Sequence, residues 1–233
     1  MKANFATKIR KLIKFFSGRY SHIKVANNSN KEWFGNDYGG FYLCPDHLNS
    51  NSIVCSFGIG QDISFDSGVI EKFDCNIFAF DPTPKSISWL KNNELLPKKF
   101  KYFQYGLGLK SEIVEFYLPK NPSHVSGSFI KQSNVDDNQV EFLEMKSWND
   151  IVEDLDFDKI DVLKLDIEGS EYEVIESILS SGIYIKQILI EFHDRMFDTK
   201  FPKSIGSIEI LNNYGYEIFG VSDSFEEISF IKA

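Results

Sequence analysis

Short apolar runs alternate with helical stretches along most of this chain, and that order constrains the fold more than any other feature. A strand, a crossover helix and a second strand build a parallel sheet, because the helix returns the chain to the same end of the sheet. We therefore predict an α/β fold with a mostly parallel sheet and helices on both faces. The expected strands are SIVCSF, CNIFAF, KYFQYGLG, DVLKLDI and QILIEFH, and the closing runs YEIFGVS and EISFIKA, which lack an intervening helix, predict an antiparallel C-terminal edge.

Length and composition fit one large domain with a small extension. The 233 residues are 42% hydrophobic and include 22 Phe and 10 Tyr, which is enough for a substantial core. We expect residues 51–233 to form the main domain and residues 1–50 to form an N-terminal helix with a cap or lid. The net charge of −9 disfavours nucleic acid as a partner, because a phosphate backbone binds clustered Lys and Arg.

The cysteines and the N-terminal residues indicate where in the cell the protein works and whether it contacts a membrane. Cys44, Cys55 and Cys75 form no C-x-x-C pair, and we interpret them as reduced thiols of a cytoplasmic protein. No apolar stretch approaches the ~20 residues of a membrane-spanning helix, and we expect no stable membrane insertion. The basic and apolar alternation of KIRKLIKFFSGRY indicates either a helix packed on the domain or one lying on an anionic membrane. This segment could also mediate homodimerisation or cover the substrate.

The segment FGIGQD follows the first expected strand of the main domain and has the features of a ligand-binding turn. In doubly wound sheets, ligands bind at the carboxyl ends of the strands. Gly58 and Gly60 allow the backbone to approach a ligand closely, and Asp81, at the end of the next strand, could accept hydrogen bonds from both hydroxyls of a ribose. Either a dinucleotide or S-adenosylmethionine (SAM) could use this pair.

Two residues favour SAM over a dinucleotide. The dinucleotide fingerprint requires a third glycine three residues after the second, where this chain has Ile63. Asp62 would repel a pyrophosphate at the start of the helix, but it could hold an ammonium or lie near a sulfonium. A glycine turn with an N-capping aspartate and no ligand is the structural alternative.

The run VLKLDIEGSE ends a strand with three acidic residues, which would repel one another in a dry interior. Strand alternation predicts that Lys164, Asp166 and Glu168 share one side. In QILIEFH the same alternation places Glu191 and His193 on one side of the strand. The two strands should be parallel neighbours, so that these groups converge beside the glycine turn.

This acidic cluster could support methyl transfer to an alcohol. A hydroxyl group with a pKa of ~15 needs a base or a metal at neutral pH. His193 could accept the proton, or Asp166, Glu191 and His193 could bind Mg²⁺ or Mn²⁺. Lys164 could neutralise Asp166 or act as a base. The alternatives are structural: Glu168 and Glu171 could serve a helix N-terminus, and His193 could be a hydrogen-bonded surface histidine.

Taken together, these motifs resemble the FkbM family of SAM-dependent methyltransferases. The resemblance covers about residues 52–193, and residues 1–50 carry no signal of it. One position departs from the family pattern, because the acid of a D-x-G turn is replaced by Ser56, and Asp62 could compensate for it. The motifs that carry the resemblance are SIVCSFGIGQDISF, IFAFDPTP, SWNDIV, IDVLKLDIEGSEYEVIES and ILIEFH.

The resemblance implies a Rossmann-like, seven-stranded class I methyltransferase fold with six parallel strands and one antiparallel strand. It implies SAM as the methyl donor and O-methylation of hydroxyls, often on sugars. It also assigns Asp81 to the ribose and Asp166, Glu168 and Gly169 to the acidic block, followed by Glu191 and His193. The SAM-binding residues that it implies are Phe57, Gly58, Gly60, Gln61 and Asp62 of the loop, with Tyr105 and Gly106 on the adenine side.

We therefore predict a SAM-dependent O-methyltransferase that acts on a sugar, either nucleotide-linked or part of a surface polysaccharide. Candidate catalytic residues are Lys164, Asp166, Glu168 and His193. An NAD-dependent oxidoreductase and a catalytically silent binding module are the alternatives. The polar segment 121–138 is a candidate substrate loop. Residues that could contact a hydroxylated substrate are His124, Ser126, Ser128, Trp33, Phe34, Tyr38 and Phe41, of which the aromatic ones could equally pack in the core.

Overall fold

The computed structural model describes residues 18–93, 95–119 and 135–233. Its centre is a seven-stranded sheet with the strand order β11-β12-β10-β9-β3-β4-β5. The strands of this sheet are β3 (Ile53–Phe57), β4 (Asn76–Phe80), β5 (Phe100–Phe103), β9 (Lys159–Leu165), β10 (Tyr184–Glu191), β11 (Tyr216–Val221) and β12 (Glu227–Lys232).

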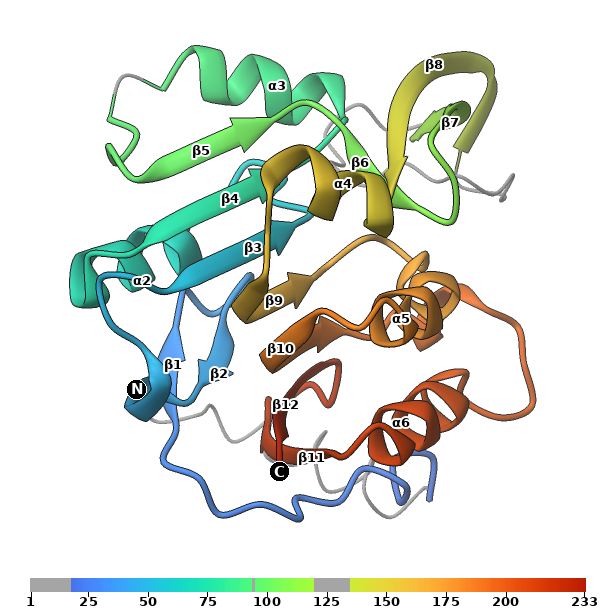
Figure 1. Cartoon of the computed structure of the whole chain (residues 1–233). Coiled ribbons are helices and arrows are strands. Elements are labelled where there is room, and N and C mark those ends of the chain that lie inside the picture. Colours follow the sequence, from blue (N-terminus) through green and yellow to red (C-terminus); the bar gives the residue numbers. More distant parts are fainter. Residues whose placement is uncertain (1–17, 94, 120–134) are drawn as a thin grey trace.

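Strand directions confirm the predicted fold class. Neighbouring strands from β10 through β9, β3 and β4 to β5 pair in parallel. β12 pairs antiparallel with both β10 and β11. β12 lies between its two neighbours, so the antiparallel strand is one place in from the edge, which β11 occupies. Figure 1 shows the parallel strands β3, β4 and β5 pointing the same way.

Helices cover both faces of the sheet, as predicted (Figure 1). One core joins α4, α5 and α6 to the sheet, and the other joins α2, α3 and an N-terminal hairpin to the opposite face. Successive residues of β3 alternate between these two cores, because side chains along a strand point to opposite faces. The helices are α2 (Ser64–Phe73), α3 (Pro84–Lys91), α4 (Trp148–Leu155), α5 (Glu171–Ser180) and α6 (Ser204–Asn213), with 3₁₀ turns η1 (Pro45–His47) and η2 (Asp194–Met196).

The N-terminal hairpin consists of β1 (Glu32–Phe34) and β2 (Phe41–Leu43) and packs against α2, β10 and β12. The buried side chain of Gln187, on β10, fixes its position. Gln187 Oε1 accepts a hydrogen bond of 2.8 Å from the Cys44 backbone N–H, and its Nε2 donates one of 3.0 Å to the Cys44 carbonyl. The amide thus replaces the backbone partners that the end of β2 would find in a sheet.

A second, three-stranded sheet has the order β6-β8-β7 and consists of β6 (Gly106–Gly108), β7 (Glu112–Pro119) and β8 (Val135–Ser147). The predicted strand KYFQYGLG is therefore wrong as one element, because its first half is β5 of the main sheet and its second half is β6. A Cβ on Gly106 would lie 2.7 Å from Met145 Sδ, so β6 approaches β8 closely. β8 also occupies the end of the segment that was predicted to be an irregular loop.

Three predictions lie mainly or wholly outside the described residues. Most of the first helix, expected in KIRKLIKFFSGRY, falls in residues 1–17, and most of the substrate loop falls in residues 120–134 with His124, Ser126 and Ser128. Homodimerisation is likewise untested. Within the described ranges, no helix is long and apolar enough to cross a membrane.

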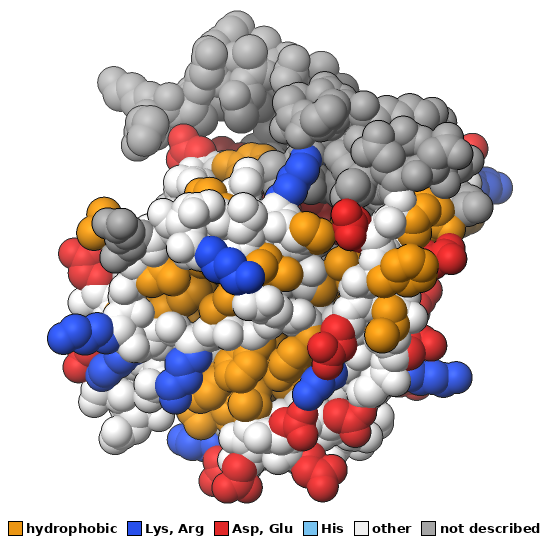
Figure 2. Space-filling model, turned by 90° about the horizontal axis from the view of Figure 1, so that it is seen from above, with side chains coloured by type: hydrophobic (Ala, Val, Ile, Leu, Met, Phe, Trp, Pro, Cys, Tyr) orange, Lys and Arg blue, Asp and Glu red, His pale blue; other side chains and the backbone are white. Residues whose placement is uncertain are grey.

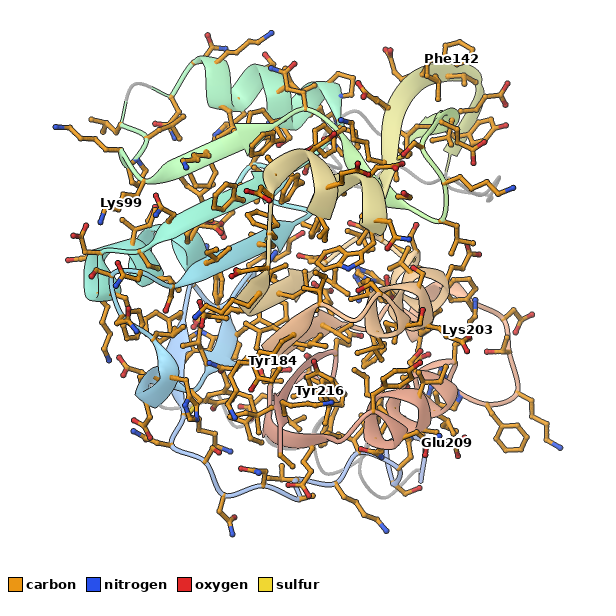
Figure 3. All side chains as sticks on the ribbon, viewed as in Figure 1. Lys99, Phe142, Tyr184, Lys203, Glu209 and Tyr216 are labelled. Atoms are coloured by element: carbon orange, nitrogen blue, oxygen red, sulfur yellow. The ribbon has the colours of Figure 1, made fainter. Side chains whose placement is uncertain are left out.

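The outer parts of the sheet carry mixed side chains. Figure 2 shows the molecule from above the β5 edge, where hydrophobic and charged side chains are interspersed. Lys101 on β5 lies over the Phe78 ring, with Nζ 4.6 Å from its centroid, and a lysine on an edge strand disfavours pairing with another chain. Tyr184 and Tyr216 lie close together near the starts of β10 and β11 (Figure 3), and Tyr216 donates a 2.7 Å hydrogen bond to the Ile185 carbonyl.

The strand order reverses between β3 and β9, since β4 and β5 lie on one side of β3 and β9 and β10 lie on the other. Such a switch point leaves a crevice at the carboxyl ends of the strands. At this point Gly58 has a φ of +75°, and a Cβ added to it would lie 1.6 Å from the Asp166 carbonyl oxygen. The first glycine of the turn is therefore required for β3 and β9 to end side by side.

We expect Gln187→Ala to lower the free energy of unfolding by about 3 kcal/mol, because it leaves two buried backbone groups of Cys44 without partners. Denaturant unfolding of the wild type and the variant measures the difference. Gln104→Ala removes an exposed side chain of the same type and should change stability by less than about 0.5 kcal/mol. Equal stability of the two variants would contradict the role assigned to Gln187.

Gly58→Ala should be more damaging, because the new methyl group overlaps backbone and the φ angle is unfavourable for alanine. We expect loss of about 3 kcal/mol or more, measured as a fall in the thermal midpoint. The matched control is Gly206→Ala in α6, where a Cβ meets nothing within 4 Å. The Gly206 change should leave stability unaltered or raise it by up to about 1 kcal/mol. A Gly58 variant as stable as the Gly206 variant would contradict the close approach of β3 and β9.

Candidate active site

A cavity of about 600 Å³ opens at the switch point, bordered by the ends of β3, β4 and β9 and by the loop of the N-terminal hairpin. This volume is typical of small-molecule sites. The sequence-predicted residues that line it are Phe57, Gly58, Gly60, Gln61, Asp62, Asp81, Gly106, Lys164, Asp166, Glu168 and Glu191.

Two residues predicted to bind SAM or to act in catalysis, Tyr105 and His193, do not line the cavity. Tyr105 packs against the core on the α4 and α5 face, and Lys146 Nζ lies 4.6 Å from its ring centroid. His193 is 1% exposed and lies behind the carboxylates of the lining. Phe57 contributes to the cavity with a ring that is itself buried and stacks on Phe80 at 4.3 Å.

The glycine turn and Asp81 form one hydrogen-bonded unit. Gly58 N–H donates to the Phe80 carbonyl at 2.9 Å, and Gly60 N–H donates to Asp81 Oδ2 at 2.8 Å. Thr83 donates to Asp81 Oδ1 through its backbone N–H and its hydroxyl, at 2.8 and 2.6 Å. Burial raises the pKa of Asp81, and the hydrogen bonds from Thr83 and Gly60 oppose that shift. The carboxylate is therefore held in one orientation at the cavity wall.

Asp62 connects the glycine turn to the hairpin loop. α2 begins at Ser64, two residues later than predicted, and Asp62 accepts hydrogen bonds from the Ser64 backbone N–H (2.9 Å) and hydroxyl (3.1 Å). Asn36 Nδ2 donates to Asp62 Oδ2 at 2.6 Å, and Asn36 Oδ1 accepts from the backbone N–H groups of Tyr38 and Gly39. Both carboxylate oxygens of Asp62 thus have protein partners.

The aromatic residues of the hairpin have different environments. Phe34 and Phe41 are buried in the core on the α2 face, and Trp33 packs edge-on against Tyr42. Tyr38 is 79% exposed and lines the cavity. Of the aromatic residues that could stack on a substrate, Tyr38 is therefore the one that the fold leaves accessible.

Lys164 compensates charge inside the sheet. It is 4% exposed, its Nζ donates to the Gly58 carbonyl at 3.1 Å, and it lies 3.7 Å from Asp166 Oδ2. Its ammonium group also lies 5.4 Å from the centroid of the Phe41 ring. This environment matches the predicted neutralisation of Asp166.

Glu171, for which the sequence suggested only a structural place at a helix N-terminus, has a different role in the fold. It is fully buried, and its Oε1 accepts hydrogen bonds from His193 backbone N–H at 2.9 Å and Nδ1 at 3.2 Å. Oε2 accepts from Gly169 N–H at 2.9 Å. Glu171 therefore fixes both the ring of His193 and the turn that follows β9.

The other nitrogen of His193 faces three carboxylates. Nε2 lies 3.5 Å from Glu168 Oε2, 3.6 Å from Glu191 Oε1 and 3.7 Å from Asp166 Oδ1. Burial lowers the pKa of His193, but the hydrogen bond and charge of Glu171, together with Glu191 and Asp166, outweigh it and raise the pKa to about 9. An imidazolium at His193 offsets the repulsion expected among the acidic residues at the end of β9.

Arg195 is a second cation at this cluster. Its Nη1 lies 3.3 Å from Glu191 Oε1 and 2.9 Å from Glu226 Oε2. Burial raises the pKa of Glu191, and the charge of Asp166 adds to the shift while His193 opposes it. Lys164, His193 and Arg195 together supply the positive charge that brings these carboxylates to one edge of the sheet.

The ligand atoms of Asp166, Glu191 and His193 lie within 4.8 Å of one another, which is compact enough to hold a metal ion. The donor set of two carboxylates and an imidazole suits Mg²⁺ or Mn²⁺ in chemical type. These groups already have protein partners, because Arg195 binds Glu191 and His193 Nε2 lies near the carboxylates of Glu168, Glu191 and Asp166. Geometry thus permits a metal, and the charge balance does not require one.

The predicted residues therefore meet around one cavity, with Asp62 and Asp81 on the glycine-turn side and Asp166 and Glu191 on the other. His193 lies directly behind the second group. Three further residues, absent from the prediction, belong to this site: Glu171, Arg195 and Asp66.

Comparison with known proteins agrees with this geometry. The model of the methyltransferase FkbM domain matches residues 43–218. A hexuronic acid methyltransferase, AglP of Haloferax volcanii, is 25% identical over 119 residues, which are 51% of this chain and 47% of that protein. The match therefore spans about half the length of this relative.

Solved structures give weaker likenesses. Fibrillarin from Methanococcus jannaschii, a pre-rRNA processing protein, has a TM-score of 0.47 at 14% identity, covering 90% of this chain and 86% of its own. Fibrillarin from Aeropyrum pernix, solved with S-adenosyl-L-methionine, has a TM-score of 0.42 at 12% identity, covering 90% and 83%. The family match, which extends over most of the chain and contains the cavity's strand ends, identifies the protein: it belongs to the FkbM family of methyltransferases.

Proposed function

We propose that this protein is a SAM-dependent O-methyltransferase that acts on a hydroxyl of a sugar. The observation that carries the proposal is a single cavity that joins a ribose-type acid on a glycine turn to a cluster of carboxylates at the ends of β9 and β10. Bound SAM supplies an electrophilic methyl group on a sulfonium. The acidic lining complements this positive charge.

The cavity residues fit SAM in two further ways. Asp81 presents an oriented carboxylate at the end of β4, where the hydroxyls of a ribose can donate to it. Asp66, which also lines the cavity, has a buried oxygen that makes no hydrogen bond with the described residues. A cationic ligand would satisfy that oxygen.

Asp166 is the group best placed to take the proton of the acceptor hydroxyl. Its side chain is 21% exposed and lines the cavity, whereas that of His193 is 1% exposed. As the hydroxyl oxygen bonds to the methyl carbon and the carbon–sulfur bond breaks, the hydroxyl proton passes to Asp166. His193 holds the carboxylates of Asp166, Glu168 and Glu191 in position and acts as a positioning residue.

A sugar is supported as the acceptor by the relative AglP, whose name describes methylation of a hexuronic acid, and by the exposed ring of Tyr38 at the cavity. The charges favour a neutral sugar. Among the described lining residues, the cations are Lys164 and Arg195, and both already pair with carboxylates. A uronate or a diphosphate would have to displace one of these pairs.

A divalent metal at Asp166, Glu191 and His193 is a second proposal for the same cluster. It would supply a Lewis acid that lowers the pKa of the acceptor hydroxyl. Family membership makes the oxidoreductase alternative unnecessary, and the catalytically silent module remains the competing function.

Incubation with SAM and matched neutral, uronate and nucleotide-linked sugars, followed by mass spectrometry, tests the acceptor. We expect a gain of one methyl group on neutral sugars and a higher kcat/KM for them than for their uronate counterparts. Parallel reactions with EDTA, and with EDTA followed by Mn²⁺, test the metal. Loss of methyl transfer with EDTA and its return with Mn²⁺ would support a metal at this cluster. Preference for the uronate would contradict the charge argument.

Asp166→Asn should lower kcat about 10²-fold or more while KM and the thermal midpoint change little, because a positioned base contributes roughly this factor. The control is Asp158→Asn, an exposed aspartate at the opposite end of β9. Steady-state rates of both variants are compared with those of the wild type. A wild-type kcat in the Asp166 variant would contradict the role of Asp166 as the base. A wild-type protein without turnover on any acceptor would favour the catalytically silent module.

A further inference from the structure

Asp66 is a buried acid of the cavity that takes no part in the proposed proton transfer. It lies in the first turn of α2, is 1% exposed and lines the cavity beside the glycine turn. Its Oδ1 makes no hydrogen bond with the described residues. A buried carboxylate oxygen without a partner costs free energy, and native proteins normally satisfy such atoms.

Ser56 is a buried hydroxyl on the same face of the sheet, near enough to Asp66 to lower the pKa of that carboxyl, but it does not line the cavity. It is the penultimate residue of β3, is fully buried, and its Oγ also makes no hydrogen bond with the described residues. Ser56 pairs in register with Lys164 of β9, and Val54 packs in the core on the α2 face. Strand alternation therefore directs Ser56 toward α2, the helix that carries Asp66.

Asp66 has no ion-pair partner among the described residues, although the charge of Lys164 acts on it. Burial raises its pKa, the Lys164 charge and the Ser56 hydroxyl lower it, and Asp62 raises it. No Lys, Arg or His of the described segments lies within 4.0 Å of its carboxylate, since Lys164 pairs with Asp166. Asp62, by contrast, is already bound to Asn36 and Ser64.

We propose that Asp66, with the buried Ser56 hydroxyl behind it, binds the α-ammonium group of the methionyl part of SAM. This inference rests on the proposed function and deepens it. An ammonium group has N–H donors for the unsatisfied oxygen of Asp66, and its charge compensates the carboxylate. The ribose is assigned to Asp81, on the other side of the glycine turn, so the two acids bind opposite ends of one molecule.

The assignment also explains the departure at Ser56. In the family pattern that this chain resembles, the strand supplies an acid at that position. Here the strand carries the small hydroxyl of Ser56, and helix α2 supplies the carboxylate of Asp66 from the facing side. The charge is retained while its place in the sequence moves by ten residues.

Calorimetric titration with S-adenosylhomocysteine and with methylthioadenosine tests the proposal. S-adenosylhomocysteine carries the α-ammonium group, whereas methylthioadenosine lacks the amino-acid part. Both ligands therefore report on the adenosine site, and S-adenosylhomocysteine alone reports on Asp66. We expect Asp66→Asn to weaken S-adenosylhomocysteine binding about tenfold to a hundredfold, the range for a charged hydrogen bond. Binding of methylthioadenosine should stay within about twofold. Unchanged affinity for both ligands, or equal loss for both, would overturn the proposal.

The double variant Ser56→Asp with Asp66→Ser moves the acid from helix to strand and keeps the total charge. We expect it to recover S-adenosylhomocysteine affinity to within about tenfold of the wild type, whereas the single variant Asp66→Ser should not recover it. The assignment to this pair would be overturned if the double variant folds, with a wild-type thermal midpoint, but does not recover its affinity for S-adenosylhomocysteine. A wild type that binds neither ligand would instead overturn the proposed function, and with it this inference.

Discussion

Charge compensation at the carboxyl ends of β9 and β10 is the constraint on which the candidate active site depends. Asp166, Glu168, Glu171 and Glu191 would repel one another in the interior of the protein. The fold meets this constraint with cations from three places: Lys164 within β9, His193 after β10, and Arg195 two residues later in η2. Because these cations are part of the protein, the cluster can form before any ligand binds.

The close packing of the glycine turn is the second requirement, and it acts together with the first. Gly58 lies against the carbonyl of Asp166, and Lys164 donates to the carbonyl of Gly58. The turn that borders the cofactor side and the strand that carries the proposed base are therefore joined by backbone contacts. A small displacement of either would change the distance between the two halves of the cavity.

Much of this arrangement could be predicted from the sequence, because it follows from general rules of parallel sheets. The alternation of strands and helices gave the fold class, and the rule that strand ends meet at one edge gave the convergence of Asp81, Asp166 and Glu191. The prediction failed where tertiary packing decides. Tyr105 follows β5 as expected, yet it packs in the core, because the chain leaves the main sheet there to form β6.

Residues on helices were the hardest to assign. Glu171 and Asp66 both lie in the first turn of a helix, where an acidic residue is common for electrostatic reasons alone. Whether such a residue faces solvent or the cavity depends on the rotation of the helix against the sheet. The acidic run after β9 contained a signal for Glu171, since three carboxylates in six residues exceed what a helix N-terminus needs, and no comparable signal marked Asp66.

The hydrogen bond between Asn36 and Asp62 has a consequence for the hairpin loop at the cavity. The hairpin loop that carries Tyr38 is fastened to the same segment that forms the glycine turn, so movement of the loop away from the cavity breaks a contact to that turn. The position of Tyr38 over the cavity is therefore fixed in part by the segment that forms the glycine turn.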